Sequence, residues 1–138
     1  MDKARNYMAL ARKAGRIELG EEPVGAAARA QHARLVIVAS DASDHTLRRA
    51  QSFVSGTQQL CIRVPYSKDE MGEAVGRSSL AIAAFTDPAL AFAFAKALDN
   101  EQYKEVIESL RVRTERVLKR QAEAKAHARN KKQGIKRK

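Results

Sequence analysis

The sequence predicts a three-layer α/β/α sandwich with a small mixed, mostly parallel sheet and a basic helical extension at its C-terminal end. Short apolar runs at residues 35–39, 60–64 and 80–85 have the length and residue types of buried strands. Helical segments separate these runs, an alternation typical of parallel strands covered on both faces. Apolar residues make up 44% of the sequence, but 25 of the 138 residues are alanine. The larger apolar side chains that remain are enough for one hydrophobic core and too few for two. We therefore expect one domain over residues 1–99 and the extension over residues 100–138.

Local signals place the first elements in order. Residues 2–14 carry small or apolar side chains at helical spacing, and Gly15 is a natural stop after a helix. Residues 16–19 fit a short edge strand, which would make four strands instead of three. Pro23 suits the first turn of a helix that continues over residues 25–30, before the first apolar strand.

Capping residues mark two later helices. Asp44 predicts the start of a helix over residues 45–54 that ends at Gly56. Asp87 is followed by Pro88, which gives a cap with proline at the first helical position. Each of these helices follows an apolar strand, as the alternation requires.

The segment between the second and third apolar strands carries a capping box. Ser67 lies at the cap position and Glu70 at the third helical position, so each side chain is placed to accept from the other residue's backbone N–H. Gly76 is expected to end this helix.

Positive charge is concentrated near the C-terminal end. The net charge is +10; residues 1–100 hold 13 basic and 11 acidic side chains, whereas residues 101–138 hold 13 basic and 5 acidic ones. A basic segment of this kind favours a polyanion as partner, most often nucleic acid. The segment lacks the apolar face of a membrane-surface helix, so we do not expect membrane binding.

The extension divides into two parts. Apolar side chains recur at helical spacing between Tyr103 and Leu118 and form a stripe that docks either on the domain or on a partner. We expect the helix to reach about residue 128. The last ten residues carry six basic side chains and no acidic one, so we expect a disordered tail that binds RNA without sequence preference. The basic residues of this tail are Arg129, Lys131, Lys132, Lys136, Arg137 and Lys138.

Several classes of protein do not fit the sequence. No apolar run approaches the length of a membrane span, and the first residues lack the apolar stretch of a signal peptide. The single cysteine, Cys61, excludes a disulfide framework and a thiolate zinc cluster, and it is expected to be a core thiol. The three histidines are too far apart for a local metal-ligand pattern. We expect a cytoplasmic protein without a metal or cofactor.

Patterns for catalysis are weak. The turns after the first and third apolar strands contain no glycine, so neither resembles a phosphate-binding loop. Asp41, Asp44 and Asp87 in these turns are interpreted as helix caps, with an acid/base cluster at the strand ends as the alternative. His32 and His45 are isolated, whereas a general base needs an oriented partner. We expect no enzymatic activity and no small-molecule substrate.

The turn at Gly20, Glu21, Glu22 and Pro23 leads from the edge strand into a helix. In one interpretation its two carboxylates simply stabilise the positive N-terminus of that helix. In the other, exposed backbone N–H groups and a carboxylate meet a nucleotide, since a carboxylate accepts hydrogen bonds from N1 and N2 of guanine. That edge of guanine is accessible in RNA loops, bulges and distorted pairs.

Basic residues flank this turn in the sequence, and together they are candidates for a positive rim that holds phosphates. The chain has no tryptophan, three tyrosines and four phenylalanines, so it is poor in residues that stack successive bases. This composition favours recognition of a folded RNA shape. The basic residues are Arg12, Lys13, Arg16, Arg29, Arg34 and Arg77.

The order of elements and four segments together resemble the kink-turn-binding superfamily of ribosomal proteins, which includes archaeal L7Ae and eukaryotic L30e. The segments are residues 10–16, 20–22, 33–43 and 64–77, and the resemblance covers about residues 5–98. The most specific segment has the form Ser-Lys-x-Glu-Leu/Met-Gly-x-Ala-x-Gly. The chain looks most like the small bacterial members of the superfamily.

The resemblance implies an α/β/α sandwich that binds RNA and performs no chemistry. The family motif G-x-N-E-x-x-K contacts sheared G·A pairs of a kink-turn, and here Gly20 matches while Glu22, Pro23 and Ala26 differ from it. A second loop of the family packs on a protruding base. The implied RNA-binding residues are Arg12, Lys13, Arg16, Gly20, Glu21, Glu22, Arg29, Val75, Gly76 and Arg77.

The function that we expect is binding of structured RNA, either kink-turn-like or ribosomal, in ribosome structure, assembly or translation. Ribosomal and translation-factor proteins are the candidate protein partners. The alternative is a protein-interaction module of the translation machinery, with a tail that binds polyanions non-specifically.

Overall fold

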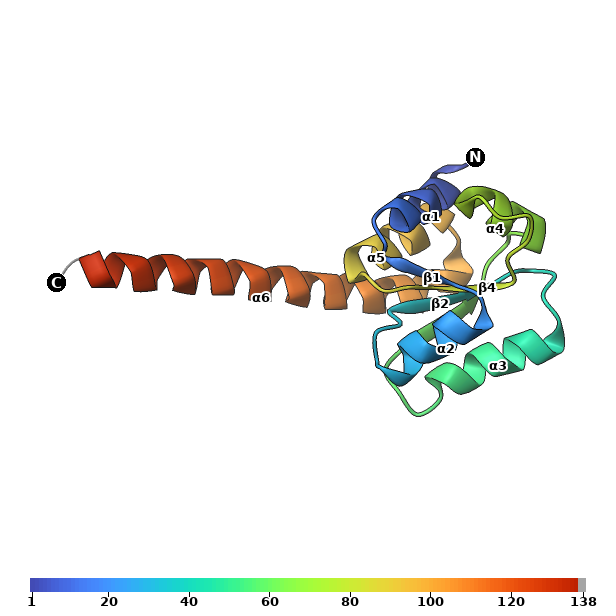
Figure 1. The fold of residues 1–138 in the computed structure, drawn as a ribbon, viewed down its shortest axis with the longest axis horizontal. Coiled ribbons are helices and arrows are strands. Elements are labelled where there is room, and N and C mark those ends of the chain that lie inside the picture. The colour runs from blue at the N-terminus through green and yellow to red at the C-terminus, as the bar shows by residue number, and fades with distance from the viewer. Residues whose placement is uncertain (137–138) are drawn as a thin grey trace.

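A four-stranded sheet lies between two layers of helices, and a long C-terminal helix projects from the domain (Figure 1). The computed structural model describes the backbone of residues 1–136 and the side chains of residues 1–129. The predicted α/β/α sandwich with a small mixed sheet and a helical extension is confirmed. The elements in chain order are α1 (Lys3–Lys13), β1 (Ile17–Leu19), α2 (Glu21–Arg29), β2 (Leu35–Val38), α3 (Asp44–Val54), β3 (Leu60–Arg63), α4 (Lys68–Val75), β4 (Ile82–Phe85), α5 (Pro88–Leu98), a 3₁₀ turn (Glu101–Tyr103) and α6 (Lys104–Lys136).

The sheet has the strand order β1-β4-β2-β3. β2 and β3 pair in parallel, whereas β4 is antiparallel to both β1 and β2. The expectation of a mostly parallel sheet is therefore wrong. β1, β2 and β3 do run in one direction, but the reversed β4 is inserted between β1 and β2.

The segment before β4 explains the reversal. α4 spans eight residues, and the chain then doubles back beside it, so that the N–H of Leu80 donates to the carbonyl of Lys68 at 3.0 Å. The chain enters β4 at the end of the sheet where β3 stops. It must then run back along β2 in the opposite direction.

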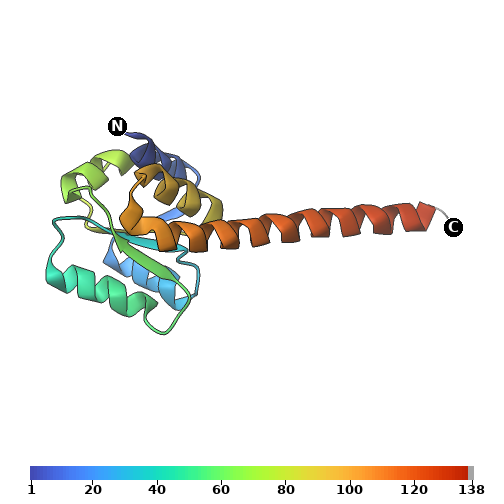
Figure 2. The same cartoon turned by 180° about the vertical axis from the view of Figure 1, so that it is seen from behind.

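The two helical layers cover opposite faces of the sheet (Figures 1 and 2). α2 and α3 pack together on one face, and α1, α4 and α5 cover the other. β2 and β4 are buried along their whole length. Phe85 of β4 packs on Phe94 of α5, with the ring centroids 4.9 Å apart. The core is therefore centred on the two inner strands.

Two local predictions need correction. β3 is an edge strand and is less buried than expected: Ile62 is its buried residue, and Cys61 is half-buried. The cap of α3 is Ser43, whose hydroxyl accepts from the N–H of Thr46 at 3.2 Å, and Asp44 is the first helical residue. A carboxylate in the first turn is still favourable there. The capping box of α4 and the aspartate cap of α5 are as predicted.

The apolar stripe of the extension docks on the protein's own domain. Tyr103 and Leu110 are buried, and the hydroxyl of Tyr103 donates to the carbonyl of Arg63 at 2.6 Å. The hydroxyl of Thr114 donates to the carbonyl of Pro88 at 3.1 Å, at the start of α5. These contacts fix the first part of α6 against α5 and β3.

The second part of α6 leaves the domain. Residues 119–129 are all exposed, and the helix continues to Lys136, beyond the predicted end near residue 128. Residues 119–133 contain neither glycine nor proline and are rich in alanine, lysine, arginine and glutamine, which have high helix propensities. The tail expected to be disordered is residues 129–138. Residues 137–138 and the side chains beyond Arg129 lie outside the described residues.

Candidate functional site

The start of α2 is opened by a glycine turn. Gly20 has φ = 97°, a region that favours glycine, and its N–H donates to the carbonyl of Ile82 at 3.0 Å. In the part of the chain that the structure describes, no side chain caps this helix. The first-turn N–H groups of α2 are therefore without a side-chain acceptor, and they carry the positive end of the helix dipole.

The two glutamates of this turn differ in their surroundings. Glu21 is half-buried, and its Oε1 lies 2.6 Å from Nε of Arg49 on α3. The Arg49 guanidinium also lies over the Phe53 ring, 5.3 Å from its centroid. Glu22 is exposed. Glu21 thus joins α2 to α3, and Glu22 is the carboxylate that faces outward.

The turn between α4 and β4 is the second part of the site. Gly76 adopts a left-handed conformation with φ = 78°, and the N–H of Arg77 donates to the carbonyl of Gly72 at 2.8 Å. Val75 is buried, whereas Gly76 and Arg77 are exposed. The turn therefore presents a glycine and a cation on a firmly hydrogen-bonded backbone.

These two turns lie at the same end of the sheet. Gly20 is hydrogen-bonded to Ile82, the first residue of β4. The segment that follows Gly76 runs back along α4 and enters the sheet at the same residue. The loop after β2 lies at this end of the sheet as well, because the N–H of Ala39 donates to the carbonyl of Ala81 at 2.9 Å. We call this end of the sheet the glycine edge, and its candidate residues are Gly20, Glu21, Glu22, Val75, Gly76 and Arg77.

The remaining candidates lie at the other end of the sheet. Arg12 and Lys13 end α1, and Arg16 precedes β1, where its carbonyl accepts from the N–H of Thr86 at 2.9 Å. Arg29 is the last residue of α2. β1 leads from Arg16 along the sheet to Gly20, and α2 leads from Gly20 back along the sheet to Arg29. Arg16 and Arg29 therefore both lie far from Gly20. The single positive rim expected from the sequence is thus split in two.

The aspartates that follow the strands do not form an acid/base cluster. Asp41 Oδ1 accepts from the N–H of Lys68 at 2.8 Å, so it supports the start of α4 across 27 positions of sequence. Asp87 caps α5 at the opposite end of the sheet. The long-range role of Asp41 carries no local sequence signal, which is why the sequence alone did not reveal it.

The other reactive side chains give no catalytic arrangement. Burial raises the pKa of the Cys61 thiol to about 11, so the thiol is protonated at neutral pH. Among the described residues no group of three histidine, cysteine or carboxylate side chains is placed to hold a metal ion. Within the same part of the chain, no helix has both the length and the apolar character needed to cross a bilayer.

These features define a small α/β/α sandwich in which an uncapped helix N-terminus and a left-handed glycine turn share one edge. The profile of the ribosomal protein L7Ae/L30e/S12e/Gadd45 family matches residues 2–91, and the chain belongs to this family. The family resemblance seen in the sequence is thereby confirmed. Residues 92–138, which include α6, lie outside the matched region.

Individual relatives agree with this assignment. The chain is 33% identical over 75 residues to a protein of Enterococcus faecium named RNA-binding protein YlxQ, a match that covers 54% of this chain and 72% of YlxQ. A Bacillus halodurans protein of unknown function aligns with a TM-score of 0.67 and 25% identity, over 72% of this chain and 100% of its own. A 15.5 kDa RNA-binding protein of Giardia lamblia aligns with a TM-score of 0.58, over 78% of this chain and 87% of its own. Its identity of 18% makes this last likeness one of fold alone.

Proposed function

We propose that the protein binds structured RNA through the glycine edge. The observation that carries the proposal is that the Gly20 turn and the segment that begins with the Gly76 turn reach the same end of the sheet, in a member of a ribosomal-protein family. The relative YlxQ is named an RNA-binding protein, which supports the same function here. The RNA that we propose is kink-turn-like or ribosomal, bound in ribosome structure, assembly or translation.

The chemistry of the glycine edge suits a distorted RNA pair. Glu22 offers an exposed carboxylate to the N1–H and N2–H donors of guanine, and Gly20 leaves room for close approach. Ala26 occupies the position of the motif's lysine. It is exposed, but its side chain carries no positive charge. Arg77, on the adjoining turn, supplies a guanidinium for a phosphate in its place.

The alternative of a protein-interaction module depended on a free apolar stripe. Tyr103 and Leu110 are buried against the domain, so most of that stripe is already occupied. Leu118, at the far end of the stripe, is 55% exposed. The observations therefore favour RNA as the principal partner.

The test compares a kink-turn RNA with a plain duplex of equal length across a series of salt concentrations. The chain truncated after residue 121 is the right fragment, because it keeps Tyr103, Leu110 and Thr114, which a fragment ending at residue 100 would lose. We expect this fragment to prefer the kink-turn, and the full chain to bind both RNAs more tightly with a steeper salt dependence. Equal binding of the fragment to both RNAs would contradict shape recognition by the glycine edge.

Arg77→Gln tests the second turn. We expect it to weaken kink-turn binding roughly 10- to 150-fold, since a charge-assisted phosphate contact is worth about 1.5–3 kcal/mol. Lys96→Gln is the matched control, because Lys96 is exposed on α5, away from the glycine edge. A loss of the same size in both variants would show that net charge alone is being measured.

A further inference from the structure

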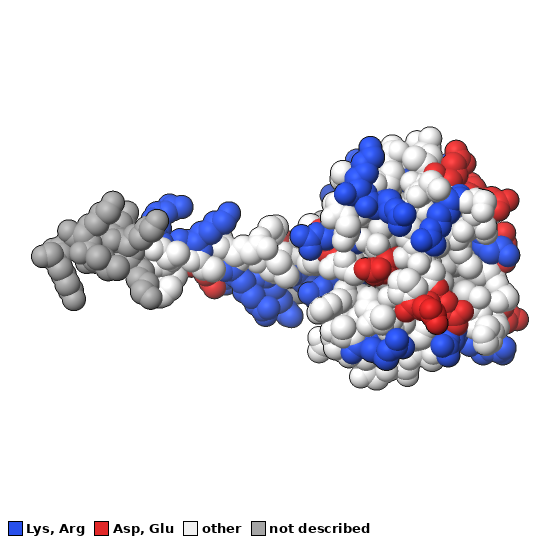
Figure 3. Space-filling model, viewed as in Figure 1, with Lys and Arg blue, Asp and Glu red and all other residues white. Residues whose placement is uncertain are grey.

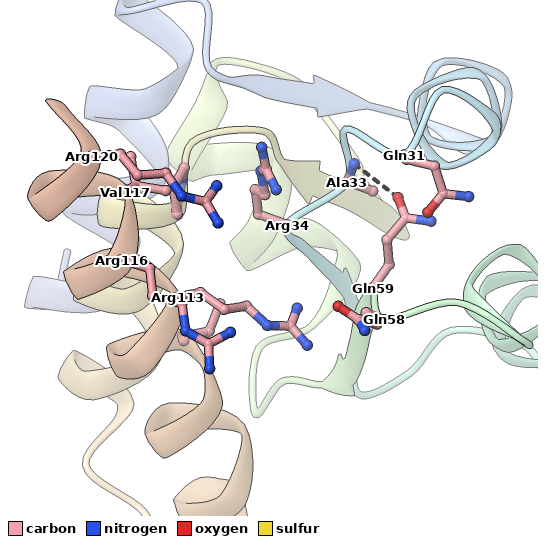
Figure 4. Close-up of a pocket in the computed structure, with 11 residues that line it drawn as sticks. Gln31, Ala33, Arg34, Gln58, Gln59, Arg113, Arg116, Val117 and Arg120 are labelled. Carbon is pink, nitrogen blue, oxygen red and sulfur yellow. Dashed lines mark hydrogen bonds between the residues drawn. The ribbon is translucent and has the colours of Figure 1, made fainter. Parts of the chain in front are cut away.

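A pocket of about 230 Å³ lies at the end of the sheet opposite the glycine edge. It forms where the residues before β2 and β3 and the start of α5 meet α6 (Figure 4). Four arginines line it: Arg34, Arg113, Arg116 and Arg120. We call it the arginine pocket. None of the described residues that line it is acidic or aromatic.

The arginines from α6 share one face of that helix. Positions 116 and 120 follow position 113 by three and seven residues, and these spacings bring side chains to the same side of a helix. The buried Leu110 and the bond from Thr114 to the carbonyl of Pro88 fix this face against the domain. The arginines are therefore presented from a part of α6 that is held in place.

Arg34 is fixed from the other side of the pocket. Its backbone N–H donates to the carbonyl of Phe85 at 2.8 Å. The preceding residue, Ala33, donates its N–H to Oε1 of Gln59 at 3.0 Å, and Nε2 of Gln59 donates to the carbonyl of Ala28. Figure 4 shows Arg34 and the α6 arginines reaching into the same hollow from opposite walls.

The charges in the arginine pocket are not compensated by the protein. Within the described residues, none of the four arginines has a carboxylate within ion-pair distance, whereas the nearby Arg111 pairs with both Glu108 and Glu115. Burial lowers the pKa of Arg113, and the charges of Arg34 and Arg116 lower it further. A bound anion would remove this repulsion.

We propose that the arginine pocket binds a phosphate group of an RNA backbone, as a second RNA contact remote from the glycine edge. Guanidinium groups match phosphate oxygens with paired hydrogen bonds, and a wall without aromatic side chains offers no stacking surface for a base. Beyond the pocket, α6 carries the exposed Lys119, Lys125 and Arg129, which suit an extended polyanion better than a small anion. The choice of RNA as that polyanion rests on the proposed function.

The experiment measures RNA affinity of the full chain with the double variant Arg113→Gln/Arg116→Gln. The control is Lys3→Gln/Lys96→Gln, which makes the same change in net charge at two exposed positions outside the pocket. The probe is a kink-turn RNA with long flanking helices, titrated at several salt concentrations. We expect the pocket variant to lose at least about tenfold in affinity and roughly two units of salt slope, and the control less than about threefold.

The outcomes separate the two proposals. If the wild type binds RNA and the pocket variant matches the control, the arginine pocket is not an RNA site and the proposed function stands. If the pocket variant loses affinity and Arg77→Gln does not, the pocket stands and the glycine edge fails. Absence of RNA binding by the wild type would overturn both.

NMR of the arginine Nε–H groups distinguishes a site for an RNA phosphate from a site for a free small anion. We expect RNA to shift the Arg113 and Arg116 signals at micromolar concentrations, and inorganic phosphate to shift them only at millimolar concentrations. Saturation by micromolar inorganic phosphate would show a site for a small anion and would overturn the assignment to RNA.

Discussion

At Gly72, α4 and the chain that doubles back over it come into contact. A Cβ at this position would lie 2.7 Å from the carbonyl oxygen of Arg77 and 2.8 Å from the backbone nitrogen of Ser79. Both neighbours are backbone atoms, which cannot rotate away as a side chain can. The missing side chain of Gly72 therefore sets the position of the turn that presents Gly76 and Arg77.

Gly72→Ala is expected to destabilise the protein by about 1–3 kcal/mol, the usual effect of overpacking, and to weaken RNA binding because the turn moves. Gly25→Ala is the matched control. A Cβ at Gly25 would meet the Phe53 ring at 3.0 Å and the Arg29 guanidinium at 3.3 Å, both of which can shift. Urea denaturation measures both variants, and equal losses would contradict the role of the Gly72 contact.

Asp2 gives the stability a dependence on pH. Its Oδ1 accepts from the N–H of Arg5 at 3.0 Å, and its Oδ2 accepts from the hydroxyl of Tyr66 at 2.8 Å. Burial tends to raise the pKa of Asp2, but these hydrogen bonds and the charge of Arg5 outweigh burial and lower it below its ordinary value. A lowered pKa in the folded state means stability that is present above about pH 4 and lost as the pH falls below it.

Asp2→Ala should therefore cost about 1 kcal/mol at neutral pH, as is typical of a lost helix cap, and less at pH 3. Asp2→Asn keeps an acceptor at the cap without the charge, so its effect should change less with pH. Urea denaturation of the three proteins at pH 7 and pH 3 checks this. A deficit for Asp2→Ala that is the same at both pH values would rule out the carboxylate as the source.

Residue-scale features were predictable where partners are close in sequence. The capping box of Ser67 and Glu70 has both partners within one helical turn, so the sequence pattern specifies it. The Glu21–Arg49 ion pair and the bond from Lys68 to Asp41 join distant segments. Their formation depends on the packing of the sheet, which no local pattern contains.

At the scale of elements, α6 combines two different environments in one helix. Leu110 is fully buried against the domain, whereas Leu118, about two turns further on, is 55% exposed. The helix thus stops contributing to the core between these two positions. The sequence predicted the stripe but left open what it docks on, since apolar spacing alone does not identify the opposite surface.

Leu110→Ala and Leu118→Ala form a matched pair on α6. We expect Leu110→Ala to cost about 2–5 kcal/mol, because it leaves a cavity in the core. Leu118→Ala should change the stability by less than about 0.5 kcal/mol. Thermal or urea unfolding compares them, and similar losses would mean that α6 docks over a longer stretch than the structure shows.

The strands show the same limit on sequence-based prediction. The apolar runs located β2, β3 and β4, because each is a short apolar segment bounded by turn residues. Their pairing was harder, since the reversal of β4 depends on the return segment held by Leu80 and Lys68. An alternation of helices and strands indicates that the strands are parallel only when each helix runs back along the full length of the sheet.

At the scale of the whole molecule, positive charge gathers away from the glycine edge. Figure 3 shows acidic and basic side chains mixed over the visible face of the domain, and mostly basic ones along the described part of the projecting helix. The arginine pocket lies where that helix meets the domain. The sequence indicated the basic extension, but it could not show that Arg34 faces Arg113 and Arg116, because 79 positions separate Arg34 from Arg113.

Uncompensated charge in the arginine pocket should reduce stability. Arg113→Gln removes a half-buried cation that faces Arg34 and Arg116, so we expect its melting temperature to rise by a few degrees at low salt. Millimolar inorganic phosphate should raise the melting temperature of the wild type more than that of the variant. A variant that melts lower than the wild type at low salt would show that Arg113 is compensated by contacts within the protein.

The most direct test of the account is the RNA affinity of Glu22→Gln. The substitution removes a negative charge, so attraction by charge alone predicts tighter binding to any RNA. Recognition of guanine by the carboxylate predicts the opposite for a kink-turn RNA: a loss of about 1–3 kcal/mol, or roughly 5- to 150-fold, with little change for a plain duplex. We predict the loss, and tighter or unchanged binding of the kink-turn RNA would contradict recognition through the glycine edge.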